Sequence, residues 1–420
     1  MTAATKLARM GPLRERNFLL LFVGQSVSGL GNALVPVALT FALLDLTHSA
    51  ADLGYVLGAE AAAQVVFLLA GGVIADRISR RTVMLASDVL RGAAEAVLGI
   101  LLITGRPSVW IIGVLAVVQG VAGAAFLPAS SGLVPAVVSP ANLQQANQLQ
   151  QVASSAASIA GPALAGVLVV TTSPGWAILL DAASFVVSVG LLAAMQLSSV
   201  PRPARKHFVA DLREGWNEFR SHNWLWPMVI AFSLVNVLVG AYSVLGPVAS
   251  QRYLGGAAAW ATVATIGGIG SVAGGLLAAR LRPRHPLKLG VSAAVLGALP
   301  PLAFAAGLPV PAIAAIAALA GTGVIVFMSM FNSTMQRQVP EHSLSRVTSY
   351  TWFGALIAYP AGLAVAGPVA SVLPVRTALL VTGALWIVAL VSLLTVRDVR
   401  RLTDEAPALA QPQVPVPGAE

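Results

Sequence analysis

Residues 72–81 read Gly-Val-Ile-Ala-Asp-Arg-Ile-Ser-Arg-Arg and end an apolar stretch. Residues 275–284 read Gly-Leu-Leu-Ala-Ala-Arg-Leu-Arg-Pro-Arg and end another apolar stretch at the matching place in the second half of the chain. The first glycine and the first arginine have the same spacing in both segments. An apolar run that ends in this way twice indicates two like-oriented halves built from membrane spans, a plan found in transporters.

The composition excludes a soluble globular protein. Of the 420 residues, 57% are hydrophobic and 10% are charged, whereas soluble proteins carry about 25% charged residues. The chain has no cysteine and only five histidines, which excludes disulfides, thiolate metal sites and a cysteine nucleophile. No catalytic set such as paired aspartates or His-Glu-x-x-His occurs within the apolar stretches. We therefore expect no enzyme activity, no metal and no cofactor.

Twelve stretches are apolar and long enough to cross a bilayer, which takes about 20 residues per helix. They are residues 18–44, 53–75, 83–104, 109–127, 152–170, 176–197, 225–249, 261–279, 287–307, 310–331, 350–372 and 375–396. The first is too long for a cleavable signal and is followed at once by another span, so it stays in the mature chain.

The basic residues predict the topology. Of the 25 lysines and arginines, 21 fall in the N-terminal arm, the C-terminal tail and the loops on one side, while Arg106, Arg252 and Arg376 fall on the other. Short loops rich in Lys and Arg stay in the cytoplasm. We therefore expect a multi-pass protein of the bacterial cytoplasmic (inner) membrane with both termini cytoplasmic. No basic stretch is interleaved with aromatic residues, so nucleic acid is not an expected partner.

A Pro-, Arg- and Lys-rich linker divides the chain into six spans and six spans. The predicted units are an N-terminal half (1–197), a cytoplasmic linker (198–224), a C-terminal half (225–396) and a cytoplasmic tail (397–420). In the linker, Phe208, Leu212, Trp216 and Phe219 recur at helical spacing among charged residues. This predicts an amphipathic helix on the inner leaflet; a solvated linker is the alternative.

The motif Gly72-x-x-x-Asp76-Arg77-x-x-Arg80-Arg81 resembles the signature loop of the major facilitator superfamily, with serine where a second glycine is usual. The stretches 17–31, 143–166 and 180–185 look like the branch that holds macrolide-efflux and enterobactin-exporter proteins. The resemblance covers nearly the whole chain. It implies an all-α membrane protein of twelve transmembrane helices in two pseudo-symmetric six-helix halves.

The signature loop is a candidate conformational latch formed by Gly72, Asp76, Arg77, Arg80 and Arg81. A carboxylate there can lie against the positive end of a helix, and the arginines can bind carboxylates or lipid phosphates. The resemblance implies that the loop holds the outward-facing state closed against span eleven. A plain positive-inside anchor is the alternative, although an anchor does not require the aspartate.

Span five contains Gly161, Pro162 and Gly166. Proline lacks the backbone N–H and glycine lets another backbone approach, so a bend or a close helix crossing is expected. The segment resembles the exporter-type motif of helix five in this superfamily. Generic packing of membrane helices explains it about as well.

Charged residues inside spans are costly and usually face a cavity or a partner. The candidates for proton coupling are Glu60, Asp88, Arg91, Glu95 and Asp181. Asp88, Arg91 and Glu95 share one face of span three at i, i+3 and i+7. We therefore expect Arg91 to pair with an acid, most readily Asp88. A structural network without a coupling role is the alternative. The second half has no acid within a span, and the only bases there, Lys288 and Arg376, are each the second residue of a span.

The substrate can only be approached through polar and aromatic residues on spans that line the cavity of the implied fold. These candidates are Gln25, Asn32, Gln64, Gln119, Asn236, Tyr242 and Trp352. An apolar cavity with a few hydrogen-bonding groups suits an amphiphilic ligand. For each residue an interhelical hydrogen bond or an interface role is an alternative.

The chain has no G-x-x-x-x-G-K-[ST] nucleotide loop, so an ion gradient is the expected energy source. We expect a monomeric secondary transporter that exports a drug, macrolide or siderophore by alternating access with proton antiport. Its partners would be a small-molecule substrate, protons and membrane lipids. An uptake permease or a lipid or lysolipid transporter of the same fold is one alternative, and a non-transporting receptor or scaffold is another.

Overall fold

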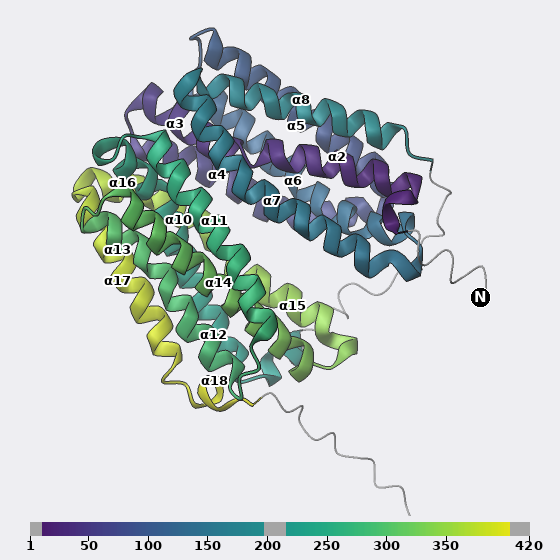
Figure 1. Ribbon diagram of the computed structural model, residues 1–420, viewed down its shortest axis with the longest axis vertical. Coiled ribbons are helices and arrows are strands. Elements are labelled where there is room, and N and C mark those ends of the chain that lie inside the picture. The colour runs from purple at the N-terminus through teal and green to yellow at the C-terminus, as the bar shows by residue number, and fades with distance from the viewer. Residues whose placement is uncertain (1–10, 197–215, 404–420) are drawn as a thin grey trace, which may run out of the picture.

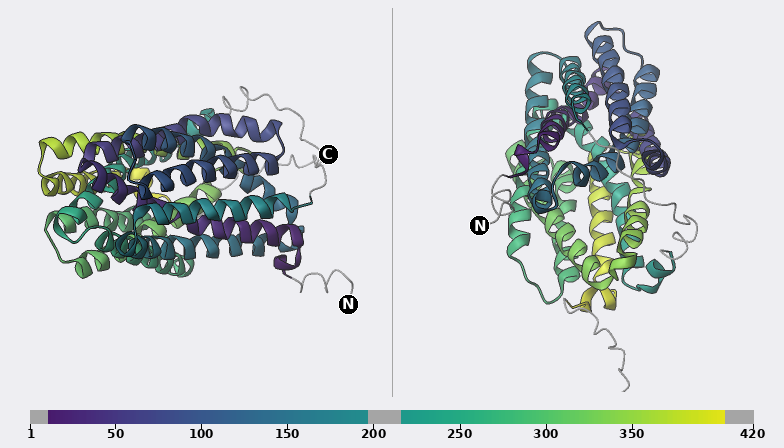
Figure 2. Two further views of the ribbon diagram at one scale, coloured as in Figure 1. Left: turned by 90° about the horizontal axis from the view of Figure 1, so that it is seen from above. Right: turned by 90° about the vertical axis from the view of Figure 1, so that its right-hand side faces the viewer.

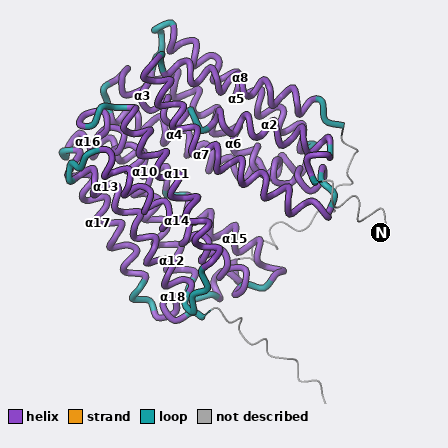
Figure 3. The backbone as a smooth tube through the Cα atoms, in the orientation of Figure 1, coloured by secondary structure: helices purple, strands orange, loops and turns teal. Residues whose placement is uncertain are grey.

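The computed structural model describes residues 11–196 and 216–403, which form helices and short connecting turns with no strand among them (Figure 3). Hydrocarbon offers backbone groups no hydrogen-bond partner, so an apolar chain must satisfy them within its own segments, and a helix does so. The all-α class expected from composition is confirmed.

The described part of the first half contains nine elements, two of them short 3₁₀ turns. They are η1 (Pro12–Arg14), α2 (Arg16–Asn32), α3 (Val35–Thr47), α4 (Ala50–Arg77), α5 (Arg80–Ile103), α6 (Val109–Val137), η2 (Pro140–Asn142), α7 (Leu143–Thr171) and α8 (Pro174–Ala193). Helices α2 and α3 together make the first span, which the sequence predicts as one stretch. The break follows Asn32 because Pro36 cannot donate a hydrogen bond to its carbonyl.

The described part of the second half begins with α10. Its elements are α10 (Leu225–Tyr253), α11 (Ala257–Arg280), α12 (Pro286–Ala294), η3 (Val295–Ala298), α13 (Leu299–Ala305), α14 (Val310–Gln338), α15 (Glu341–Leu356), α16 (Tyr359–Val372), α17 (Val375–Leu393) and α18 (Arg397–Arg401). Span nine consists of α12, η3 and α13, and span eleven consists of α15 and α16. Prolines follow closely after both breaks, at Pro300 and Pro360.

Eleven segments of the described chain are long and apolar enough to cross a membrane. Helix α5 is also long enough, at 24 residues, but carries Asp88, Arg91 and Glu95 in its middle and makes the twelfth span. The expected twelve-helix architecture is therefore confirmed. Viewed from above, the helices of both halves run side by side along one direction (Figure 2).

The two halves touch at one end and separate at the other (Figure 1). At the touching end, called the closed end, α4 packs on α16 and α7 packs on α11. One hydrophobic cluster joins both halves there, including Phe41 and Leu363. At the other end, called the open end, each half has its own cluster, around Phe18 and around Trp224. The open end is the side on which the first described residues and α18 lie.

Small residues bring the halves together at the closed end. A Cβ on Gly54 would approach the Leu363 carbonyl oxygen to 2.5 Å, and one on Gly367 would meet the backbone of Ala51. Such contacts let membrane helices pack backbone to backbone. The Gln251 side chain also donates a hydrogen bond of 3.0 Å to Asp45, from α10 to α3.

The end of the linker packs on the second half. Residues 216–221 are helical, and the rings of Trp216 and Phe219 lie 5.4 and 4.8 Å from that of Trp226, centroid to centroid. Phe219 is 2% exposed. Phe208 and Leu212, which belong to the amphipathic pattern, lie outside the described residues.

Candidate functional site

Buried acids of the first half meet where α5, α6 and α8 pack around the end of α2. Helix α5 buries Asp88 and Glu95, and α8 buries Asp181; their exposed fractions are 0, 3 and 0%. The approach is close because small residues line it. A Cβ on Gly31 of α2 would overlap the Asp181 carboxyl group, and one on Gly92 of α5 would approach the Phe185 Cβ to 2.9 Å.

Arg91 lies at the centre of this site but does not pair with an acid. Its Nε donates to the Gln119 Oε1 at 3.2 Å and one Nη donates to the Asn32 Oδ1. The guanidinium stacks 4.6 Å above the Phe185 ring. No carboxylate of the described residues lies within ion-pair distance of it. The expected pairing of Arg91 with Asp88 is wrong, because Arg91 reaches across to α2 and α6.

Glu95 and Asp181 form what we call the carboxyl pair. The two side chains come from helices that pack on each other, α5 and α8, and lie close enough for their charges to interact. Glu95 Oε1 accepts from Gln119 Nε2 at 2.5 Å, and Asp181 Oδ1 accepts from Ser184 Oγ at 2.8 Å. Their other oxygens, Oε2 and Oδ2, have no donor among the described residues. Each carboxyl group thus has a single donor, and two negative charges buried this close would repel each other strongly in a medium of low dielectric constant.

The other two candidate acids stand apart from this pair. Asp88 accepts from Ser188 Oγ at 2.7 Å, and its Oδ1 has no partner among the described residues. Glu60 is half-buried on α4, where a Cβ on Gly120 would meet its backbone carbonyl. Four acids and one arginine thus gather in the first half.

A polar cavity of about 490 Å³ lies in the first half and is called the N-half cavity. Two predicted residues line it, Gln25 and Asn32. Gln25 donates to Ser130 at 2.5 Å and accepts from Gln150 at 2.7 Å. Since Asn32 also accepts from Arg91, one residue joins the cavity wall to the acid site.

A second cavity of about 480 Å³ lies in the second half and is called the C-half cavity. Three predicted residues line it: Asn236, Tyr242 and Trp352. The remaining two candidates lie elsewhere. Gln119 belongs to the acid site, and Gln64 is exposed on α4 and lines neither cavity.

The candidate latch is described only in part. Arg80 donates to the carbonyl oxygen of Gly132, and Arg81 donates to those of Leu192 and Ala193 at 2.7 and 2.5 Å. These carbonyls lie late in α6 and α8, where the helix dipole favours a cation. The side chains of residues 69–77, including Gly72, Asp76 and Arg77, lie outside the described part of the chain.

The helix-five segment, residues 161–166 of α7, contacts two other parts of the fold. A Cβ on Gly161 would overlap Ala33, which lies in the break between α2 and α3, and one on Gly166 would overlap the Cβ of Ala261 on α11. Pro162 lies inside α7 without ending it. The segment therefore contacts both the break in span one and the opposite half.

Sequence reasoning missed the hydroxyls and rings that complete the sites. Ser184 and Ser188 follow Asp181 at i+3 and i+7, a spacing that could have indicated them as donors on one helix face. Trp260 and Trp386, which line the C-half cavity, have no such local signal, because their neighbours come from other helices.

Residues 21–359 match the sequence profile of the Major Facilitator Superfamily. The chain belongs to this superfamily. It is a transporter and not an enzyme. It is 26% identical over 385 residues to the multidrug efflux pump Tap of Mycolicibacterium fortuitum, covering 86% of this chain and 90% of that protein. It is 23% identical over 398 residues to macrolide efflux protein A of Streptococcus pyogenes, covering 92% and 97%.

Solved structures of the superfamily share the fold. The nucleoside transporter NupG superposes with a TM-score of 0.72 at 12% identity, covering 90% of this chain and 98% of that one. A bacterial homologue of the human lysosomal transporter Spinster, in an inward-facing and unoccupied conformation, superposes with a TM-score of 0.64 at 14% identity, covering 91% and 94%. At these identities the likeness concerns the fold alone.

Proposed function

We propose that this protein is a secondary active exporter that moves a hydrophobic or amphiphilic small molecule, such as a drug, a macrolide or a siderophore, in exchange for protons. The names of the multidrug and macrolide efflux relatives support the direction and the substrate class. The Lys and Arg distribution supports cytoplasmic termini in a bacterial inner membrane. With that orientation, the open end faces the cytoplasm, where an exporter loads its substrate.

The observation that carries the proposal is the carboxyl pair. Two buried acids this close would repel each other if both were ionised, so we expect the pair to hold one proton in this conformation. When that proton leaves, two negative charges face each other in a medium of low dielectric constant and repel strongly. The nearby guanidinium of Arg91 is the cation that can move to neutralise this charge. Its hydrogen bonds go to two neutral side chains, Asn32 and Gln119.

Movement of Arg91 toward the deprotonated pair would release Asn32 at the end of α2. This residue precedes the break in span one, and its own side chain donates to the Ser28 carbonyl at 2.6 Å and lines the N-half cavity. Gly161 of α7 packs on the other side of the same break. Proton loss is thereby coupled to the cavity wall and to the helix that contacts the opposite half.

Alternating access requires that the halves touch at one end at a time, and here they touch at the closed end and are apart at the open end. The closed end is held chiefly by the close backbone packing of α4 on α16 and of α7 on α11, together with the hydrogen bond between Gln251 and Asp45, and these contacts can separate as the open end comes together. The arginines of the signature loop would then find partners across the halves at the cytoplasmic side. We assign the latch role to Gly72, Asp76, Arg77, Arg80 and Arg81 on this basis.

The test uses purified protein in liposomes with an imposed pH gradient and a panel that begins with ethidium and erythromycin. We expect Glu95→Gln and Asp181→Asn to abolish gradient-driven accumulation but to keep substrate exchange without a gradient, because the amide mimics the protonated acid. Asp88→Asn is the matched control: it changes a buried acid of α5 outside the pair and should keep coupled transport.

Coupled transport that survives in both Glu95→Gln and Asp181→Asn would refute the carboxyl pair as the coupling site. The direction of flux in inverted and right-side-out vesicles separates export from uptake. Movement of a fluorescent lysolipid in place of the panel compounds would favour a lipid transporter. Lack of flux for every compound would favour a receptor or scaffold.

A further inference from the structure

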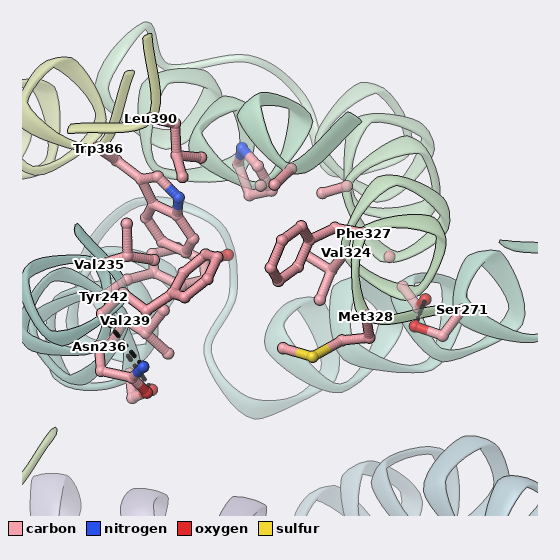
Figure 4. Close-up of a pocket in the computed structure, with 18 of the residues that line it drawn as sticks. Val235, Asn236, Val239, Tyr242, Ser271, Val324, Phe327, Met328, Trp386 and Leu390 are labelled. Carbon is pink, nitrogen blue, oxygen red and sulfur yellow. Dashed lines mark hydrogen bonds between the residues drawn. The ribbon is translucent and has the colours of Figure 1, made fainter. Parts of the chain in front are cut away.

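The C-half cavity lies entirely within the second half of the protein. The residues that line it come from helices α10, α11, α14, α15 and α17 and from the interrupted span nine, and Figure 4 shows several of them. Its volume of about 480 Å³ is within the range of about 300–1,000 Å³ typical of sites for small organic molecules. The carboxyl pair is on the other half, so this cavity needs its own explanation.

Aromatic rings make up much of the wall. The rings of Phe232 and Phe327 lie 4.6 Å apart and those of Tyr242 and Trp260 lie 5.6 Å apart, centroid to centroid. Phe331, Trp352 and Trp386 also line the cavity. Such walls bind flat ring systems through large apolar contacts in offset or edge-on arrangements. The wall therefore favours a ligand that contains rings.

Among the described residues, no charged side chain lines the cavity. The polar groups on the wall are mostly used within their own helices: Asn236 donates to the Phe232 carbonyl at 2.9 Å and Ser243 donates to the Val239 carbonyl at 2.9 Å. Ser271 donates in the same way, to the Gly267 carbonyl at 3.1 Å. A charged ligand would find no counter-ion here.

Two donors remain. Trp386 is 6% exposed, and its indole Nε1 has no hydrogen-bond partner among the described residues. A buried N–H without an acceptor is costly. The Tyr242 hydroxyl points into the cavity from α10, which packs on the helix of Trp386, α17 (Figure 4). Both groups can donate to an acceptor atom of a ligand.

The interruption of span nine places Trp386 beside the cavity. Ala294, Gly297 and Pro300 of this span line it, and a Cβ on Gly297 would approach the Trp386 ring to 3.1 Å. Irregular backbone at membrane depth occurs where it is buried in protein or lines a cavity. Broken helices at binding sites are a recurring feature of transporters.

We propose that the C-half cavity is a binding site for an uncharged, ring-containing amphiphile whose oxygen atom accepts hydrogen bonds from Trp386 Nε1 and the Tyr242 hydroxyl. The inference rests on the proposed function, because it names the chemistry of the molecule that the exporter would carry. A cation could also be drawn to aromatic faces, but the two donors oppose it and no acid is present. The site therefore selects ketones, lactones or ethers over ammonium compounds.

The experiment compares benzophenone with diphenylmethane, which has the same two rings but no carbonyl oxygen. Purified full-length protein is irradiated with benzophenone, which also reacts covalently with nearby C–H bonds under ultraviolet light, and labelled peptides are mapped by mass spectrometry. We expect adducts in α10, α14 or α17. Diphenylmethane should compete with a half-maximal concentration about tenfold higher than that of unlabelled benzophenone, the factor expected for one or two net hydrogen bonds.

The double variant Trp386→Phe with Tyr242→Phe keeps both rings and removes both donors. In this variant the half-maximal concentrations of diphenylmethane and benzophenone should differ by no more than about twofold, because neither hydrogen bond can form. Val239→Trp, which fills the cavity, should abolish labelling, whereas Val114→Trp on a face that is 64% exposed is its control. Should Val239→Trp fail to fold, the double variant still tests the proposal.

Adducts outside the cavity, an unchanged tenfold preference in the double variant, or stronger competition by benzyltrimethylammonium than by diphenylmethane would each overturn the inference. Binding is measured without a pH gradient, so its outcome is independent of coupling. Labelling as expected together with coupled transport in both Glu95→Gln and Asp181→Asn would refute the coupling mechanism and leave this site standing. Absence of labelling together with normal coupled efflux would refute this binding site and leave the coupling mechanism standing.

Discussion

Gly166→Ala should shift the protein away from the conformation described here. The contact between Gly166 of α7 and Ala261 of α11 joins the two halves at the closed end, and the added methyl group would overlap the alanine side chain. Overpacking of this kind costs about 1–3 kcal/mol. Because the two helices belong to different halves, the cost falls on the state in which this end is closed. The ratio of closed to open molecules at this end should therefore fall by about 5- to 150-fold.

Distances between spin labels measure this shift. The chain has no cysteine, so pairs of introduced cysteines can be labelled without background. Labels at positions 106 and 373 report the closed end, and labels at positions 144 and 282 report the open end. In Gly166→Ala the first distance should lengthen and the second should shorten.

Gly190→Ala is the matched control, since a Cβ there would meet no atom within 4 Å. Both distance distributions should stay as in the unmodified sequence. If Gly166→Ala and Gly190→Ala give the same distributions, the contact does not distinguish the two states and the reasoning from overpacking is refuted.

Three further predictions concern the acid site and the stability of each half. Arg91→Lys replaces a planar fork by a point charge that cannot hold both partners; losing one hydrogen bond of ~1.5 kcal/mol predicts about tenfold slower coupled transport, measured in proteoliposomes. Burial raises the pKa of the Glu15 carboxyl, but hydrogen bonds from Asn142 and Ser139 bring the pKa below 4.5 overall. The ionised carboxylate therefore stabilises the fold above pH 4.5, and this stabilisation is lost as the pH falls. Glu15→Gln should melt at a lower temperature than the parent at pH 7, and the two melting temperatures should converge at acidic pH. Gly270→Ala would overlap the backbone of α14 and should lower the melting temperature, whereas Gly275→Ala, whose nearest contact is 3.9 Å, should not.

Much of the fold was predictable because it follows from local composition. A run of about 20 apolar residues must become a helix in hydrocarbon, whatever surrounds it. Span three was predicted as 83–104 and is Arg80–Ile103. The breaks in spans one, nine and eleven were not predicted, although a proline follows each. Proline removes one hydrogen bond, but neighbouring helices decide whether the helix then bends or stops.

The candidate site was predictable as a set of residues and not as a set of contacts. The i, i+3, i+7 spacing on α5 correctly put Asp88, Arg91 and Glu95 near one face, since helix geometry alone decides that. The sequence by itself also determined that buried charge belongs to the first half. Which groups lie together was decided by packing: Glu95 lies near Asp181 because α5 packs on α8, and Arg91 bonds neutral side chains from α2 and α6. Contacts between residues far apart in the chain depend on how whole helices fit together, and no local pattern carries that information.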